Sequence, residues 1–150
     1  MKLKFVYSKV YFEQLNKYKR IKRNWKEVKK IGKKFEKKYK KEINKITRLI
    51  PKIVRKPWRK KEINVYIVDW AGPSFSHPLT LKVRKDLLLM LVILTHELLH
   101  HFYTKKFYLD EEGNETKINK KVKEVFEKLK LDVKKQLKTL QKYHNKRFSK

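Results

Sequence analysis

Apolar residues recur every three or four positions between residues 28 and 50, and this periodicity limits the fold more than any other feature of the chain. They are Val28, Ile31, Phe35, Tyr39, Ile43, Ile46 and Ile50. The spacing predicts one long amphipathic helix, because residues three or four apart lie on one helical face. Asn24 and Glu27 form a capping-box pattern at its start, and Pro51 predicts its end. With 3 Gly and 4 Pro in 150 residues, the chain has too few turn residues for an all-β sandwich.

The remaining pattern predicts a single small α+β domain. Alternating apolar and polar residues predict strands at 2–7, 62–68 and 79–83, the last two joined as a hairpin. A short helix is expected within 10–23, and a third helix at about 85–106. After a polar loop at 109–114, a fourth apolar stripe follows, formed by Ile118, Val122, Val125, Phe126 and Leu129 and continued by Val133, Leu137 and Leu140.

The chain is strongly basic, with 43 Lys and Arg against 15 Asp and Glu and a formal net charge of +28. Many cations lie on the face of the long helix opposite its apolar stripe: Lys26, Lys29, Lys30, Lys33, Lys37, Lys40, Lys41, Lys45 and Arg48. Such a face either binds a polyanion or is simply solvated, and spacing alone favours the solvated face. Lysine enrichment is also typical of heat-adapted proteins, so the charge needs a second, independent observation before it indicates nucleic acid.

Composition excludes several other classes. Without Cys, the chain has neither a disulfide framework nor a thiolate metal site. The longest apolar run, 87–94, has about eight residues, far fewer than the roughly 20 that span a bilayer, so no membrane partner is expected. Residues 1–5 carry no hydrophobic signal segment, and we expect a cytoplasmic protein.

The third helix contains His96-Glu97-Leu98-Leu99-His100, an H-E-x-x-H pattern. Four residues rotate a helix by about 400°, so His96 and His100 lie on one face and can bind one metal ion. Glu97 lies about 100° farther round, where its carboxylate can reach a metal-bound water. Zinc fits best, with two imidazoles, a carboxylate and a water in its four positions. The alternative is that the histidines are ordinary core polar groups, although burying them with Glu97 is costly without a metal or partner.

A third ligand is expected downstream, where the acidic candidates are Asp110, Glu111, Glu112, Glu115, Glu124 and Glu127. The helical phase distinguishes among them. Relative to Val122, Glu115 lies only about 20° away, whereas Glu124 and Glu127 lie about 200° and 140° off the apolar face. Glu115 is therefore expected to point into the core.

A carboxylate on a buried stripe needs a cation, and a metal held by His96 and His100 is the nearest one for Glu115. Asn119 lies one turn farther on the same face, where it can accept a hydrogen bond from a ligand imidazole. The alternative is that Glu115 is a charge at a helix N-terminus, stabilised by the helix dipole.

The order of these elements resembles the gluzincin clan of zinc metallopeptidases, especially its minimal members, the minigluzincins. The resemblance covers about residues 1–131 and is specific at two segments, His96–His100 and 115–119. The second segment, Glu115-Thr116-Lys117-Ile118-Asn119, is also similar to the E-x-x-A-N/D segment of the anti-repressor peptidases.

The resemblance implies a minimal zincin-like domain with a long N-terminal amphipathic helix, a small three-stranded mixed sheet, an active-site helix and a downstream glutamate helix. Residues 132–150 would then be a basic helical extension. It also implies that His96, His100 and Glu115 are zinc ligands and that Glu97 is the general base. The strand at 79–83 would border the cleft as a sheet edge and pair with an extended substrate.

These features predict a zinc-dependent endopeptidase that hydrolyses a protein or peptide substrate with metal-activated water and Glu97 as general base. Latency is an open alternative, because residues 132–150 either pack against the domain or cover the cleft. A different function is a nucleic-acid-binding protein with a structural or vestigial metal site, in which helix 25–48 and the tail contact phosphates. His101 is expected to pack beside the site, and His77 to lie in a loop.

Overall fold

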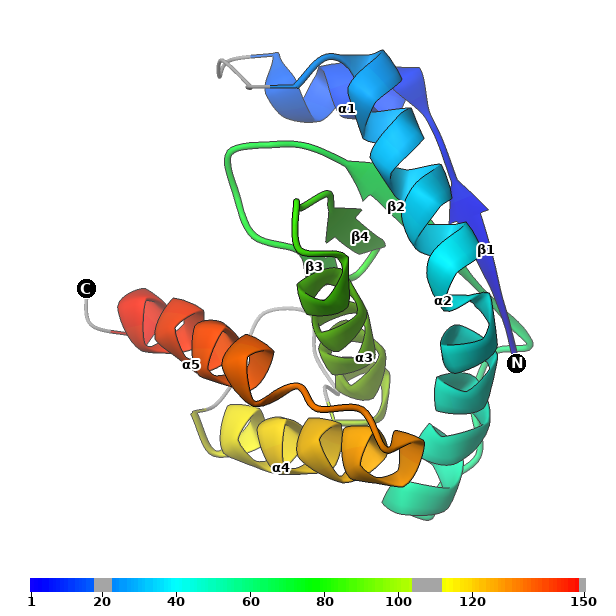
Figure 1. The fold of residues 1–150 in the computed structure, drawn as a ribbon, viewed down its shortest axis with the longest axis vertical. Coiled ribbons are helices and arrows are strands. Elements are labelled where there is room, and N and C mark those ends of the chain that lie inside the picture. Colours follow the sequence, from blue (N-terminus) through cyan, green and yellow to red (C-terminus); the bar gives the residue numbers. More distant parts are fainter. Residues whose placement is uncertain (18–22, 104–111, 149–150) are drawn as a thin grey trace.

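The computed structural model describes residues 1–17, 23–103 and 112–148 of the chain (Figure 1). The elements in these ranges are β1 (Lys2–Val6), α1 (Lys9–Asn16), α2 (Trp25–Val54), β2 (Glu62–Val68), β3 (Phe75–Ser76), β4 (Leu79–Lys82), α3 (Leu87–Tyr103), α4 (Glu112–Leu129) and α5 (Lys134–Phe148). The α+β prediction is confirmed, but the sheet has four strands where three were predicted. The additional strand, β3, has two residues and is too short to show an alternating pattern. The predicted positions 18–22, 104–106 and 109–111 lie outside the described residues.

The strands lie in the order β1-β2-β4-β3. β2 is parallel to both β1 and β4, whereas β3 is antiparallel to β4. The predicted hairpin between 62–68 and 79–83 is therefore wrong. After β2 the chain first forms β3 at the outer edge and then returns as β4, so that Ile67 pairs with Leu81 in parallel. Alternation does not reveal strand direction, because parallel and antiparallel strands share the same side-chain period.

α2 is the predicted long helix. Local sequence signals predict its start correctly and its end incorrectly. The Asn24 side chain accepts a hydrogen bond from the Glu27 N–H (3.0 Å), and the Glu27 carboxylate accepts one from the Asn24 N–H (2.9 Å), which confirms the capping box. The predicted end at Pro51 is wrong, because Pro51 lies inside the helix. Proline has no N–H to donate to the carbonyl of Thr47, and the Trp58 indole N–H donates to it instead, at 2.8 Å.

α2 and α3 contact each other, and both contact the sheet (Figure 1). The predicted apolar stripe of α2 faces this core, and Ile31 alone of its predicted members is partly rather than fully buried in the described structure. α2 approaches the sheet closely at Gly32, where an added Cβ would lie 2.7 Å from the Tyr7 ring and 2.8 Å from Ile67. α3 is buried on every side from Leu89 to His100, so its polar residues lie inside the protein.

α4 and α5 complete the core around α3. The predicted continuous stripe is interrupted at Lys130, whose left-handed φ of 56° follows the end of α4. α5 then begins at Lys134 in the predicted helical extension, and Val133 directly before it and Leu140 within it are buried in the common core. The Gln136 side-chain amide donates to the Asp86 carboxylate (3.0 Å) and joins α5 to the start of α3. Among the described residues, none of the helices combines the length and hydropathy that a membrane crossing requires.

Candidate metal centre

Three buried side chains from two helices meet at one point. His96 and His100 lie one turn apart on α3, and Glu115 lies near the start of α4. Glu115 Oε2 is 3.3 Å from His96 Nε2, Glu115 Oε1 is 3.4 Å from His100 Nε2, and the two Nε2 atoms are 2.9 Å apart. The exposed fractions are 2% for His96, 4% for His100 and 6% for Glu115. The structure thus brings together the three residues that the sequence proposed as ligands.

Helical phase explains why Glu115 reaches the histidines and the later acidic residues of α4 do not. Ile118 and Val122 share its face and are fully buried, and α4 packs against α3. Glu124 lies on another face of α4 and pairs with a lysine of its own helix, and so does Glu127, which is exposed. The remaining candidates are outside the residues whose side chains the structure describes: Asp110, Glu111 and Glu112.

The donor set fits zinc in chemistry and in spacing. Two imidazole nitrogens and a carboxylate are zinc ligands, and tetrahedral bonds of about 2.0–2.1 Å place neighbouring ligand atoms about 3.3 Å apart. The distances from the Glu115 oxygens to the two Nε2 atoms, 3.3 and 3.4 Å, match this spacing, and the distance between the two Nε2 atoms is somewhat shorter. A cation here would offset the cost of removing a carboxylate from water. The buried cluster could therefore hold a metal ion.

Glu97 lies beside this cluster and is not one of its members. It follows His96 by one residue, about 100° around α3, and it is 9% exposed. In the described part of the chain, the group of side chains whose atoms converge for a metal consists of His96, His100 and Glu115. A buried carboxylate next to a candidate metal site, and outside its group of converging atoms, is compatible with a general base.

Asn119 lies one turn after Glu115 on α4 and is partly buried. Its side-chain oxygen is buried and has no hydrogen-bond partner among the described residues. The structure therefore does not join Asn119 to His96 or His100 by a hydrogen bond, and its supporting role stays a prediction.

The structure also brings together His77 and His101, a contact that the sequence did not predict. His101 belongs to α3, as His96 and His100 do. The ring of His77, from the turn between β3 and β4, contacts the ring of His101 with centroids 4.3 Å apart, and Ser76 Oγ is 2.9 Å from His77 Nδ1. Burial, together with the nearby charges of His77, Lys60 and His100, lowers the pKa of His101 to about 4. His101 is therefore neutral at pH 7. Periodicity could not reveal this contact, because it depends on how β3 pairs with β4.

The strand predicted to bind substrate is not a sheet edge. β4 lies between β2 and β3, and Leu79 and Thr80 pair with Ser76 and Phe75 of β3. The expectation that 79–83 forms the edge is therefore wrong, and β3 is the outer strand at this end of the sheet. An extended peptide that joined the sheet at this end would pair with β3.

Comparison with known proteins gives no match. No protein family, no curated protein and no solved structure matches the chain. The function must therefore be inferred from the geometry of the chain's own residues.

Proposed function

We propose that this chain is a zinc-dependent metallopeptidase of the zincin type, acting as an endopeptidase. His96, His100 and Glu115 hold the metal, and Glu97 is the general base. One observation carries the proposal: the Glu115 carboxylate, from a separate helix, lies within 3.4 Å of both histidine Nε2 atoms in a buried site. The H-E-x-x-H pattern alone provides two ligands, and a catalytic zinc site requires a third from elsewhere in the fold.

Zinc held by His96, His100 and Glu115 would act as a Lewis acid toward a peptide carbonyl and would lower the pKa of a water ligand toward 7. Glu97 accepts the proton of the attacking water and transfers it to the leaving amine. The burial of α3 from Leu89 to His100 supports the proposal, because packing would hold His96, Glu97 and His100 in place.

Elemental analysis of tag-free protein tests the metal centre. The wild type is purified without added metal, offered zinc and compared with His100→Ala, Glu115→Gln and Glu97→Gln. Glu124→Gln is the matched control, because Glu124 lies on the same helix as Glu115 but pairs with Lys121 on another face. We expect about one zinc per chain in the wild type, Glu97→Gln and Glu124→Gln, a loss in His100→Ala and weaker binding in Glu115→Gln.

A peptidase assay on an unfolded protein substrate then tests the reaction. Zinc-loaded wild type and Glu124→Gln should cleave it, and zinc-loaded Glu97→Gln should not. A wild type that takes up no zinc would contradict the metal centre. Zinc uptake without cleavage by the wild type would contradict the peptidase and leave a structural metal site. Equal cleavage by Glu97→Gln would contradict the role of Glu97.

A further inference from the structure

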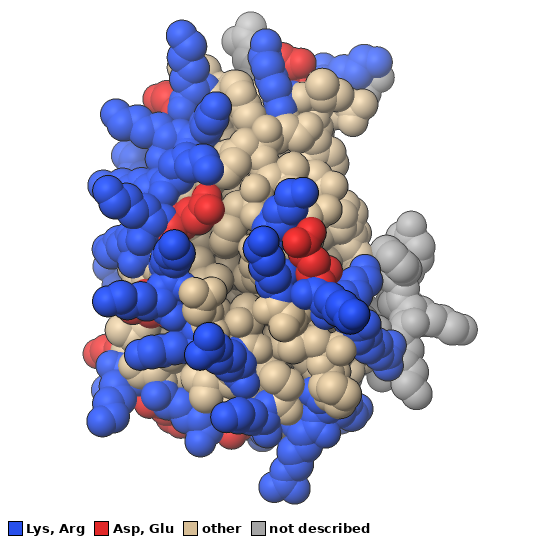
Figure 2. Space-filling model, turned by 90° about the vertical axis from the view of Figure 1, so that its right-hand side faces the viewer, with Lys and Arg blue, Asp and Glu red and all other residues tan. Residues whose placement is uncertain are grey.

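α2 carries a stripe of basic side chains directly opposite its buried face. We define the α2 basic stripe as Lys30, Lys34, Lys37, Lys41 and Arg48. α2 departs from helical geometry at Tyr39, with φ −109° and ψ 18°. At about 100° per residue, Lys30, Lys34 and Lys37 fall within about 60° of one another before Tyr39, and Lys41 and Arg48 within about 20° after it. All five side chains are exposed. Figure 2 shows one side of the molecule on which Lys and Arg form a dense column while acidic groups are few.

Acidic neighbours do not balance this charge. The five residues of the stripe form no ion pair with any residue that the structure describes, and the ion pair seen on α2 in those ranges joins Lys33 to Glu36 at 3.5 Å. Glu27 is held in the capping box at the helix start. Heat-adapted proteins instead arrange abundant lysine and glutamate into ion-pair networks. Like charges one turn apart destabilise a helix, and a bound polyanion removes this repulsion.

The chemistry of the surface favours nucleic acid over a membrane or an acidic protein. A membrane-surface helix inserts its apolar face into lipid, but the apolar face of α2 is buried in the core at Val28, Phe35 and Ile46. Protein interfaces are enriched in aromatic residues and arginine and depleted of lysine, whereas this stripe contains four lysines and Arg48. Lysine binds phosphate as a compact point charge and needs no base edge.

The length of α2 also suits a linear polyanion. From Lys30 to Arg48 the stripe extends at most about 27 Å at 1.5 Å per residue, which corresponds to about eight base pairs at 3.4 Å each. We propose that the α2 basic stripe is a sequence-independent binding surface for the phosphate backbone of a nucleic-acid duplex. This inference does not depend on the metal centre, because His96, His100 and Glu115 belong to α3 and α4.

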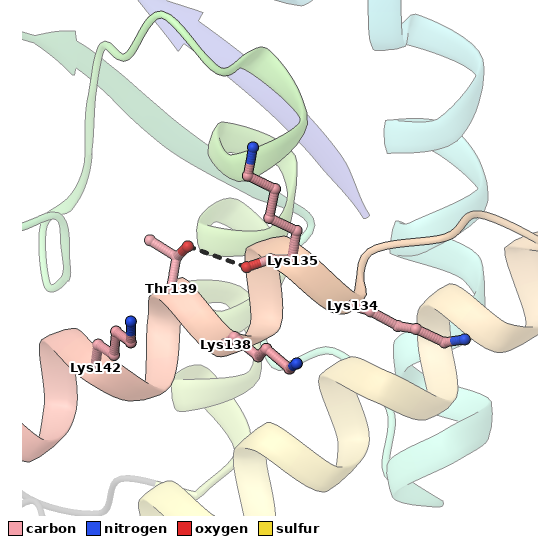
Figure 3. A pocket seen from close by; sticks show the side chains of 5 residues that line it. All are labelled: Lys134, Lys135, Lys138, Thr139 and Lys142. Atoms are coloured by element: carbon pink, nitrogen blue, oxygen red, sulfur yellow. Dashed lines mark hydrogen bonds between the residues drawn. The ribbon is translucent and has the colours of Figure 1, made fainter.

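A second lysine-rich surface serves as a control. A shallow pocket of about 400 Å³ on α5 is lined by Lys134, Lys135, Lys138, Thr139 and Lys142 (Figure 3). Lys135 points away from Lys134 and Lys138 in this view, so the ammonium groups do not converge on one anion. α5 has 15 residues, half the length of α2. The four lysines that line the pocket allow the same change in net charge on a different element.

Fluorescence anisotropy of a labelled 20-base-pair duplex of arbitrary sequence, titrated with the full chain, tests the proposal. For about six phosphate contacts, wild-type affinity should fall about 10³-fold between 50 and 200 mM salt. The variant Lys30→Gln/Lys34→Gln/Lys37→Gln/Lys41→Gln should bind at least about tenfold more weakly and reduce the slope of log K against log salt by up to about 3.6, or 0.9 for each lost contact. Glutamine and lysine have similar helix propensities, and circular dichroism checks that α2 is retained.

The matched control, Lys134→Gln/Lys135→Gln/Lys138→Gln/Lys142→Gln, removes the same charge from α5 and should keep the wild-type slope within about one unit. An equal loss in both variants would overturn the assignment to α2, because net charge alone would then explain binding. Absent or salt-independent binding by the wild type would overturn the proposal outright. Tighter binding to phosphatidylserine vesicles than to the duplex would replace the nucleic acid with a membrane surface.

Discussion

Replacing Glu115 with Gln should have opposite effects on stability with and without zinc. In the presence of a chelator, the buried Glu115 side chain has its oxygens 3.3 and 3.4 Å from the Nε2 atoms of His96 and His100 and no metal ion to compensate an ionised carboxylate. Gln has nearly the same shape and no charge, so it avoids the cost of removing an ionised carboxylate from water. Without metal, the melting temperature of Glu115→Gln should therefore equal or exceed that of the wild type, by about 2–4 °C for each kcal/mol.

Zinc should reverse this order. A ligand present at 100 times its dissociation constant stabilises the native state by about 2.7 kcal/mol, which corresponds to about 5–11 °C for a chain of this size. We expect this increase in the wild type. In Glu115→Gln, an amide oxygen replaces the anionic ligand, so the same zinc concentration should raise the melting temperature by much less.

Differential scanning calorimetry at pH 8, in chelator and in excess zinc, measures both effects. Glu124→Gln makes the same change in charge on the same helix but lies outside the cluster, so it should respond to zinc like the wild type. A zinc-dependent increase in Glu115→Gln equal to that of the wild type would refute the assignment of Glu115 as a ligand. A large loss of stability of Glu115→Gln in chelator would refute the argument about its buried charge.

Three other substitutions test separate parts of the structure. Glu97→Gln should lower the rate constant of single-turnover cleavage by about 10²–10⁴-fold while its zinc content stays unchanged. The control Glu127→Gln should leave both quantities unchanged. Trp58→Phe removes the donor to the Thr47 carbonyl, so urea unfolding should show a loss of about 1–3 kcal/mol. The pKa of His101 is about 4 in the folded protein, against a usual value of 6.5. The contribution of His101 to the free energy of unfolding is therefore complete above pH 6.5 and falls by about 1.4 kcal/mol for each pH unit between 6.5 and 4. Urea unfolding of His101→Gln across this range, in chelator, should show a flatter acid limb than the wild type.

More of the candidate site than of the sheet could be predicted from the sequence, because the site depends on residue spacing within two helices. His96 and His100 share a face by their spacing, and the phase of Val122 places Glu115 on the buried side of α4. The packing of two apolar faces then suffices to bring the three side chains together. The contact between His77 and His101 could not be found in this way, because it depends on the pairing of β3 with β4.

The errors in the predicted fold also arise where contacts between distant residues override a local sequence signal. Pro51 is a strong local signal for a helix end, but the Trp58 indole supplies the hydrogen bond that the proline cannot make, and the helix continues. β3 gains its strand geometry from two paired residues of β4 rather than from its own pattern. Its presence also removes β4 from the edge of the sheet, which changes where a peptide could pair.

α2 explains how a small chain can carry both a buried candidate metal site and a strongly charged surface. Its inner face packs with Phe35 and Ile46 in the core, and this burial holds the helix in place whatever its outer face carries. A face that served only for solubility would mix both signs of charge, since alternating Glu and Lys stabilises a helix through pairs one turn apart. The α2 basic stripe instead places four lysines and Arg48 together without ion pairs among the described residues. The fold tolerates this repulsion because α2 is anchored from inside, and a phosphate backbone is the partner that would turn the repulsion into binding energy.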